Sequence, residues 1–286
     1  MKTVTLLVVA LCASAATAYA DFSYTTTRKA QGPTAAAAPS STKYYYKGQK
    51  MMTDTDATAM IMDFASQTIT TVHKTQKTWS VMKFSDVGQV VKQSDVDAKM
   101  DVKETGQKKI INGFNATEVI MTMEMDSPQM SQAGMKMQME VDTWLSSDVP
   151  GAQELKAFHQ KNAGNMPWAA MGGAGMQKAV TEIQRKMATI GGVPLLQVVK
   201  MKSAGGGAQA AQMQGGMAQA RAQMEAMVKQ GGPQAAAAQQ ALARMGGGAS
   251  GGSLFETTIE SSGFSTSSIP DSVFAIPAGF QKSDRK

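Results

Sequence analysis

The sequence predicts an α+β protein built on an antiparallel sheet. Between residues 43 and 145, Ile, Val, Thr, Met and aromatic residues recur in runs of four to twelve, and short turn sequences separate the runs. Such runs with tight turns between neighbours are typical of antiparallel strands. After Pro150-Gly151 the apolar residues change to the three- and four-residue spacing of helices. We therefore expect a sheet first and covering helices after it.

The first 20 residues predict a signal peptide. Lys2 precedes an apolar run from Val4 to Leu11, which is too short to span a bilayer, and Ala18-Tyr19-Ala20 matches a cleavage site. Cleavage after Ala20 would place the mature protein in the periplasm or outside the cell. The alternatives are a buried N-terminal strand and lipid attachment at Cys12, which the bulky preceding Leu11 disfavours. Residues 21–42, rich in Thr, Ala and Pro, predict a flexible N-terminal tether.

Composition excludes several classes of protein. Cys12 is the single cysteine and leaves with the signal, so disulfides, cysteine nucleophiles and thiolate metal sites are not expected. The formal net charge is +6, but Lys and Arg are scattered among Asp and Glu. A nucleic-acid groove is normally more clustered, so we expect no nucleic-acid partner and at most peripheral contact with an anionic membrane. No later segment has the unbroken apolar length of a membrane span.

The expected strands follow one another closely. Asp54-Thr55-Asp56 supplies turn chemistry after the first strand, and Asn112-Gly113 is the strongest short hairpin signal in the chain. The predicted strands cover residues 44–53, 58–63, 67–73, 78–84, 97–104, 108–111, 114–125 and 134–145.

The second half predicts a helical lid and a long insertion. Residues 153–160 form an expected helix with Leu155 and Phe158 on one side. A second apolar stripe at helical spacing follows and ends at Gly191-Gly192; its lid residues are Met176, Val180, Ile183 and Met187. Residues 193–202 and 254–261 read as two arms of a hairpin. Between them lies an Ala-, Gln-, Gly- and Met-rich low-complexity insertion, 203–253, in which 218–229 and 234–245 favour helix. The domain would thus comprise 43–202, with its lid at about 152–190, and 254–286.

Methionine alternates with polar residues in two of the predicted strands. Residues i and i+2 of a strand share a face, so two strands paired across 126–133 would gather their thioethers on one surface. Burying six methionines is worth about 9–18 kcal/mol as an upper bound, which is comparable to the stability of a whole domain. Something must therefore cover this face. Its predicted members are Met100, Met121, Met123, Met125, Met135, Met137, Met139 and Val141.

Three interpretations of these methionines stay open. They can form an ordinary core, because methionine is apolar and fills irregular space. They can bind a hydrophobic small molecule or an acyl chain, because the unbranched thioether adapts to varied shapes. They can also bind Cu(I), which thioethers suit, although methionines along one strand lie roughly 6–7 Å apart rather than converging.

Catalytic signatures are not evident. The chain contains no G-x-S-x-G, H-E-x-x-H or P-loop sequence, and it has no zinc-like spacing of His, Cys and carboxylate. Asp54 and Asp56 could form a carboxylate pair, but a polar turn explains them better. We expect no catalytic residues, no metal site of the zinc type and no cofactor.

Five segments carry a resemblance to a known family. They are KGQKMMTDT, TAMIMDFASQTITTVHKTQKTWSVMKF, KIINGFNATEVIM, VDTWLSSDVPGAQELKAF and SIPDSVFAIPAGFQK. Together they resemble an uncharacterised family of bacterial exported proteins, a domain of unknown function that is similar in turn to the LolA- and LppX-like outer-membrane lipoprotein carriers. The resemblance covers about residues 43–202 and 254–286, and none of its segments is a catalytic signature. The insertion 203–253 departs from a compact carrier.

The resemblance implies an open half-barrel antiparallel sheet whose concave face is covered by helices. In the carriers the concave space receives acyl chains. The expected function is thus that of an exported, non-enzymatic protein that binds a lipid or a lipoprotein acyl chain. Alternatives are a periplasmic Met-rich Cu(I)-binding protein, and a structural or assembly protein that uses its low-complexity arm.

Overall fold

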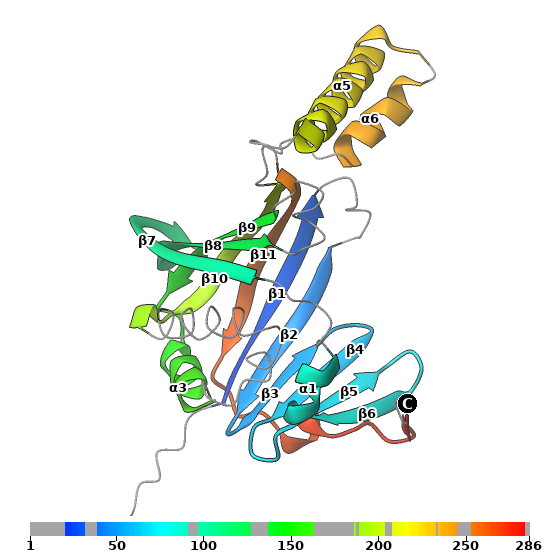
Figure 1. Cartoon of the computed structure of the whole chain (residues 1–286). Coiled ribbons are helices and arrows are strands. Elements are labelled where there is room, and N and C mark those ends of the chain that lie inside the picture. The colour runs from blue at the N-terminus through cyan, green and yellow to red at the C-terminus, as the bar shows by residue number, and fades with distance from the viewer. Residues whose placement is uncertain are drawn as a thin grey trace, which may run out of the picture.

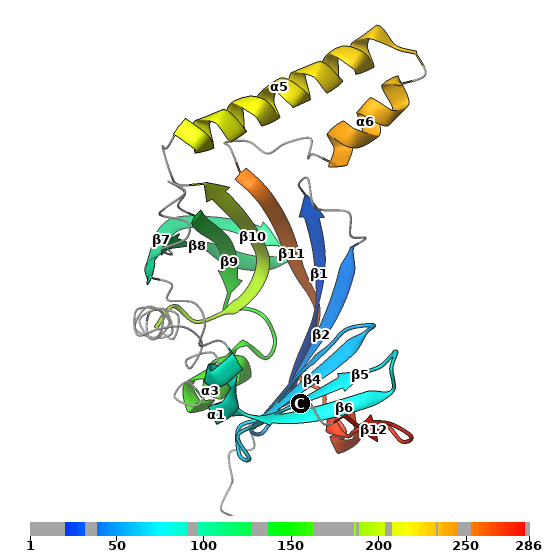
Figure 2. The same ribbon diagram turned by 45° about the vertical axis from the view of Figure 1, so that its right-hand side comes forward.

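One open sheet organises the molecule. The computed structural model describes residues 21–31, 39–90, 97–126, 137–162, 186, 189–203, 208–232, 234–244 and 253–283. Its twelve strands are ordered β12-β6-β5-β4-β3-β2-β1-β11-β10-β9-β8-β7, so the sheet ends at β12 and β7 and does not close on itself. All neighbours pair antiparallel except β12 with β6. The prediction of an α+β protein with an open, mostly antiparallel sheet is confirmed. Strands β7 to β11 curve strongly (Figure 2).

Strands β1 to β6 are neighbours in one half of the sheet, and strands β7 to β11 are neighbours in the other half. The two halves meet where β1 pairs with β11. The strands are β1 (Phe22–Gln31), β2 (Ser40–Lys47), β3 (Lys50–Asp54), β4 (Thr58–Asp63), β5 (Thr68–His73), β6 (Thr78–Lys83), β7 (Asp97–Ile111), β8 (Phe114–Asp126), β9 (Met137–Ser146), β10 (Val193–Ser203), β11 (Ser253–Ser265) and β12 (Gln281–Lys282). The helices are α1 (Phe84–Val90), α3 (Ala152–Asn162), α5 (Ala208–Gln230), α6 (Ala235–Arg244) and the 3₁₀ turn η3 (Asp271–Phe274).

The N-terminal segment contains a central strand, so the prediction of a tether over residues 21–42 is wrong for 21–31 and 40–42, while residues 32–38 lie outside the described residues. Strand β1 lies between β2 and β11 (Figure 1). Phe22, Tyr24 and Thr26 are buried while the residues between them are less so, which is the alternation of a strand with one face in the core. Asp21 is also fixed, because its Oδ2 accepts a hydrogen bond of 2.6 Å from the backbone N–H of Ile269.

Two turns set the register of their hairpins. Residues 44–53, expected as one strand, are divided by Gly48, whose φ of +58° makes the turn between β2 and β3. Asn112 and Gly113 have φ values of +51° and +84°, as a two-residue hairpin turn with both central residues left-handed requires. Strands β7 and β8 pair from this turn outward, with Ile111 opposite Phe114, which confirms the predicted hairpin.

The main core is aromatic and lies against β1 and β2, in the middle of the strand order. The Phe22 ring lies 5.6 Å from that of Tyr24 and 6.0 Å from that of Tyr46. Phe158 of α3 meets Tyr46 edge-on at 5.1 Å, and it also meets Phe64 at 5.6 Å. Such edge-to-face pairs are favourable beyond their buried area. Helix α3 is therefore fixed against β1, β2 and the residues that follow β4.

A second apolar cluster, which includes residues of the C-terminal segment, covers the opposite face of β3–β6. Met52, Ile61 and Val72 are buried there and pack with Val273, Phe274 and Phe280 of the C-terminal segment. This segment ends in β12, which adds to β6 at Thr78 and Trp79. The C-terminal residues thus complete the fold, as the sequence predicts for 254–286.

The insertion contains a helical hairpin. Helices α5 and α6 pack against each other and lie beyond the ends of β10, β11 and β1 (Figures 1 and 2). The helical propensity at 218–229 and 234–245 is confirmed, although α5 begins earlier, at Ala208. No helix among the described residues has the length and apolar character needed to cross a membrane.

Two core tyrosines should make the protein sensitive to alkali. Burial raises the pKa of Tyr24 to about 12 and raises the pKa of Tyr46 as well. An unfolded tyrosine loses its proton near pH 10, so above that pH the unfolded chain binds fewer protons than the folded one. Stability should fall as pH rises from about 10 to about 12. We expect the urea midpoint to drop in this range. In Tyr24→Phe the urea midpoint should fall less over this pH range. An equal fall in the variant and the parent would show that Tyr24 does not cause the loss of stability.

Candidate functional site

The paired strands β7 to β10 bring methionines from four segments into one row. Met123 lies opposite Met100 on one side and Met139 on the other, and Met139 lies opposite Met201. Residues directly opposite each other in neighbouring strands project from the same face of a sheet. The four side chains therefore form a continuous line across the strands, which we call the methionine row: Met100, Met123, Met139 and Met201.

Flanking rows extend the apolar surface in both directions. On one side Met125 lies opposite Met137. On the other side the next row consists of apolar residues from the same four strands. We define the methionine face as the methionine row with Met125, Met137, Val102, Met121, Val141 and Val199.

Most of the predicted face is thereby assembled. The register places Met100, Met121, Met123, Met125, Met137, Met139 and Val141 on one face, as strand alternation predicts. Met135 lies outside the described residues. Sequence reasoning did not include Val199 and Met201 of β10. Their alternation in VPLLQVVKMKS was a usable signal, but it needed the knowledge that β10 is the neighbour of β9.

The methionine face is half-buried, and its burial increases along the strands. Met121, Met123 and Met139 each keep an intermediate exposure. The next row toward the core end contains Val119 and Thr143, both with 0% exposure. The face therefore passes from a sealed interior at one end to partly accessible thioethers at the other.

The opposite face of the same strands is charged. Glu140 lies opposite Lys200, and its carboxylate is 3.8 Å from the ammonium of Lys200 and 3.0 Å from that of Lys202. Asp142 is also on this face, where burial, with a further contribution from Glu118, raises the pKa of its carboxyl group. Because this side of β9 and β10 carries the charges, an apolar partner would contact the thioether side of the sheet.

The predicted lid divides into a fixed part and an undescribed part. Leu155 and Phe158 of α3 are 3% and 7% exposed and belong to the aromatic core around Phe22. They are therefore core residues rather than a surface that opens. Met176, Val180, Ile183 and Met187 lie outside the described residues, so helices over the methionine face stay a prediction.

A small pocket beside α3 does not suit an acyl chain. It is lined by Phe22, Tyr46, Gly48, Ala157 and Phe158, among others, and its volume is about 20 Å³. That volume holds about one water molecule. The pocket is therefore too small for an apolar ligand with a chain of several carbons.

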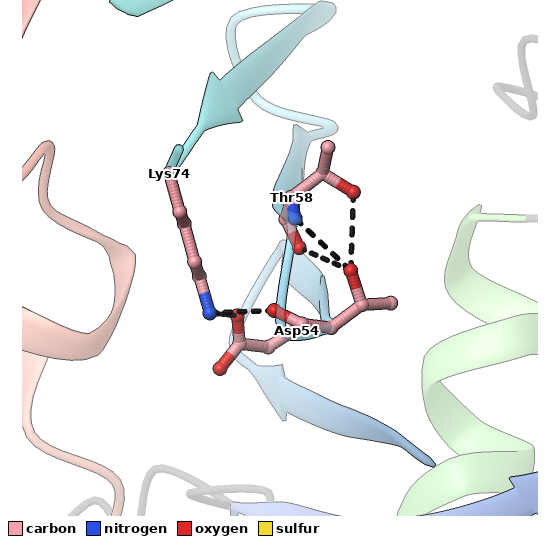
Figure 3. Close-up of polar contacts among 4 residues, drawn as sticks. Asp54, Thr58 and Lys74 are labelled. Carbon is pink, nitrogen blue, oxygen red and sulfur yellow. Dashed lines mark hydrogen bonds and ion pairs between the residues drawn. The ribbon is translucent and has the colours of Figure 1, made fainter. Parts of the chain in front are cut away.

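The Asp54 region is a structural turn. Lys74 reaches both the Asp54 carboxylate and the backbone carbonyl of Thr55 (Figure 3). The Thr55 hydroxyl donates to the carbonyl of Thr58 at 2.9 Å and accepts from its N–H at 3.0 Å. These bonds support the turn interpretation of the Asp54 and Asp56 pair. Within the described ranges, no cluster of three or more His, Cys, Asp or Glu side chains is placed to hold a metal ion.

Comparisons with known proteins give structural likeness alone. No family model matches the chain, and no curated protein matches it. A LolA superfamily protein from Nitrosomonas europaea is similar over 90% of each chain, with 9% identity and a TM-score of 0.27. The structure of PNGF-II is similar over 93% of this chain, with 7% identity and a TM-score of 0.33. The match spans about a third, 32%, of the PNGF-II chain. Neither likeness carries an argument about function, so the site is interpreted from its own residues.

Proposed function

We propose that the chain is an exported, non-enzymatic protein that binds an apolar molecule, such as a lipid acyl chain, on the methionine face. The observation that supports this most directly is the register of β7 to β10. It gathers half-exposed thioethers on one side of strands whose other side is charged. Flexible thioethers can adapt to chains of different shape.

The energetics favour reversible binding. Each buried methylene contributes about 0.8 kcal/mol, so an acyl chain of roughly ten methylenes gains about 8 kcal/mol on full burial. Association costs at least about 4 kcal/mol in lost translational and rotational freedom. The remainder corresponds to binding in the millimolar range for one chain. A lipid with two or more chains would be held more firmly, and it would still be able to leave.

Export rests on the signal-like residues 1–20 and on the position of β1. Strand β1 begins at Phe22, directly after the proposed cleavage point, and Asp21 is already fixed to Ile269. Cleavage after Ala20 would therefore leave the first strand whole.

Native mass spectrometry of the exported, processed protein tests the proposal. We expect a population that carries a lipid mass, and we expect collisional activation to release that mass. The delipidated protein should then bind a fluorescent fatty acid, and phospholipid should displace it. Protein that emerges empty and also fails to bind the fluorescent fatty acid would refute the proposed function.

A further inference from the structure

The methionine row also has the composition of a soft-metal site. Methionines that alternate along a single strand lie roughly 6–7 Å apart, which is too far for several sulfurs to meet at one point. The pairing found here removes that obstacle, because Met100, Met123, Met139 and Met201 come from four adjacent strands. Neighbouring strands are about 4.8 Å apart, and directly opposite Cβ atoms are about 4.5–5.5 Å apart.

The side chains can close the remaining distance. Methionine has three rotatable bonds and places its sulfur well beyond Cβ, so sulfurs of opposite residues can turn toward a shared point. Three thioethers can therefore reach one ion without any change in strand pairing.

The donors select the class of ion. Thioether sulfur is a soft, neutral ligand that prefers Cu(I) among biological metals, whereas Zn²⁺ sites are built from His, Cys and carboxylates. The row that adjoins the methionine row on the core side consists of Val102, Met121, Val141 and Val199, which bring no charge to this face. The carboxylate of Glu140 is on the other face, where Lys200 and Lys202 hold it.

We propose that the methionine row binds a soft monovalent cation, Cu(I) or its analogue Ag(I), through the sulfurs of three neighbouring methionines. These side chains are half-buried, and their remaining exposed surface gives the ion access from solvent. This inference goes beyond the proposed function. It uses the same surface, so an ion and an acyl chain would compete for it.

Titration of the delipidated, processed protein tests this site separately from lipid binding. Ag(I) replaces Cu(I) because it is not oxidised by air, and protein labelled with ¹³C at the methionine methyl groups reports each thioether. We expect Ag(I) to shift the methyl signals of the methionine row, and we expect Zn²⁺ to leave them unchanged. Cu(I) competition against bicinchoninate then measures the affinity.

The double variant Met123→Leu with Met139→Leu removes the two central donors but keeps an apolar face. Leucine for methionine costs little stability, so this variant should fold. We expect its affinity for Cu(I) to fall at least about tenfold. The control is Met51→Leu with Met62→Leu, a second pair of opposite methionines on β3 and β4, which should bind as the parent does.

Two results would overturn the site. One is unchanged Cu(I) affinity in the Met123 and Met139 variant. The other is loss of binding in a variant of Met224 and Met227, which would place the ion on α5 instead. If the unmodified protein binds Ag(I) but no lipid, the proposed function is refuted and the metal site is not.

Discussion

Replacing Gly151 with alanine should destabilise the protein by about 2–5 kcal/mol, through overpacking and backbone strain together. Gly151 has a φ of +90°, which L side chains rarely adopt. A Cβ at this position would lie 2.1 Å from Cδ2 and 2.5 Å from Cε2 of Phe22. Phe22 cannot easily give way, because it is 1% exposed and packs against Tyr24 and Tyr46.

The matched control is Gly113→Ala. Gly113 has a similar φ of +84°, but a Cβ there would meet nothing within 4 Å. In this variant the free energy of unfolding should fall only by the cost of backbone strain, about 1–2 kcal/mol. Urea unfolding of the two variants measures the difference. Equal losses would show that the Phe22 ring does not hold the start of α3, and a recovery of stability in Gly151→Ala with Phe22→Leu would confirm that it does.

A charge in the middle of the methionine face should abolish apolar binding. In Met139→Asp the new carboxylate would lie between Met123 and Met201. A bound acyl chain would have to cover this charge, and burying an unpaired charge costs several kcal/mol. We expect the affinity for a fluorescent fatty acid to fall about 100-fold, which corresponds to ~2.8 kcal/mol.

Gln138→Asp makes the same charge change one residue away. Gln138 faces the charged side and lies between Lys202 and Glu124, so the new carboxylate has a cation beside it and stays off the methionine face. This variant should bind the fatty acid as the parent does. Equal losses in both variants would point to a general effect on β9 and would argue against the methionine face as the binding surface.

Local signals in the sequence predicted much of the sheet. Asn112-Gly113 sets its hairpin through two left-handed residues, and neighbouring strands then pair because the chain between them is short. Alternation also predicted which side chains of β8 and β9 share a face. These features depend on residues close together in the chain, so a single sequence contains them.

Features that depend on distant segments were not predictable in the same way. Strand β1 was expected to be a tether, because its Thr- and Ala-rich neighbourhood outweighed the alternation of Phe22, Tyr24 and Thr26. Met201 joined the site only because β10 follows β9 in the sheet. The candidate site could thus be predicted on β7, β8 and β9, and its members on β10 came from the sheet order.

The place of β11 in the sheet has a consequence for the proposed export of the chain. It separates β1 from β10, and its residues from Glu256 to Glu260 pair with both neighbours. A chain that crosses a membrane from its N-terminus delivers β1 first and β11 more than 200 residues later. If the chain is exported as proposed, the earlier strands have open edges until then, and the slow formation of such distant contacts would delay folding during its passage. The fold would thus be completed on the far side of the membrane.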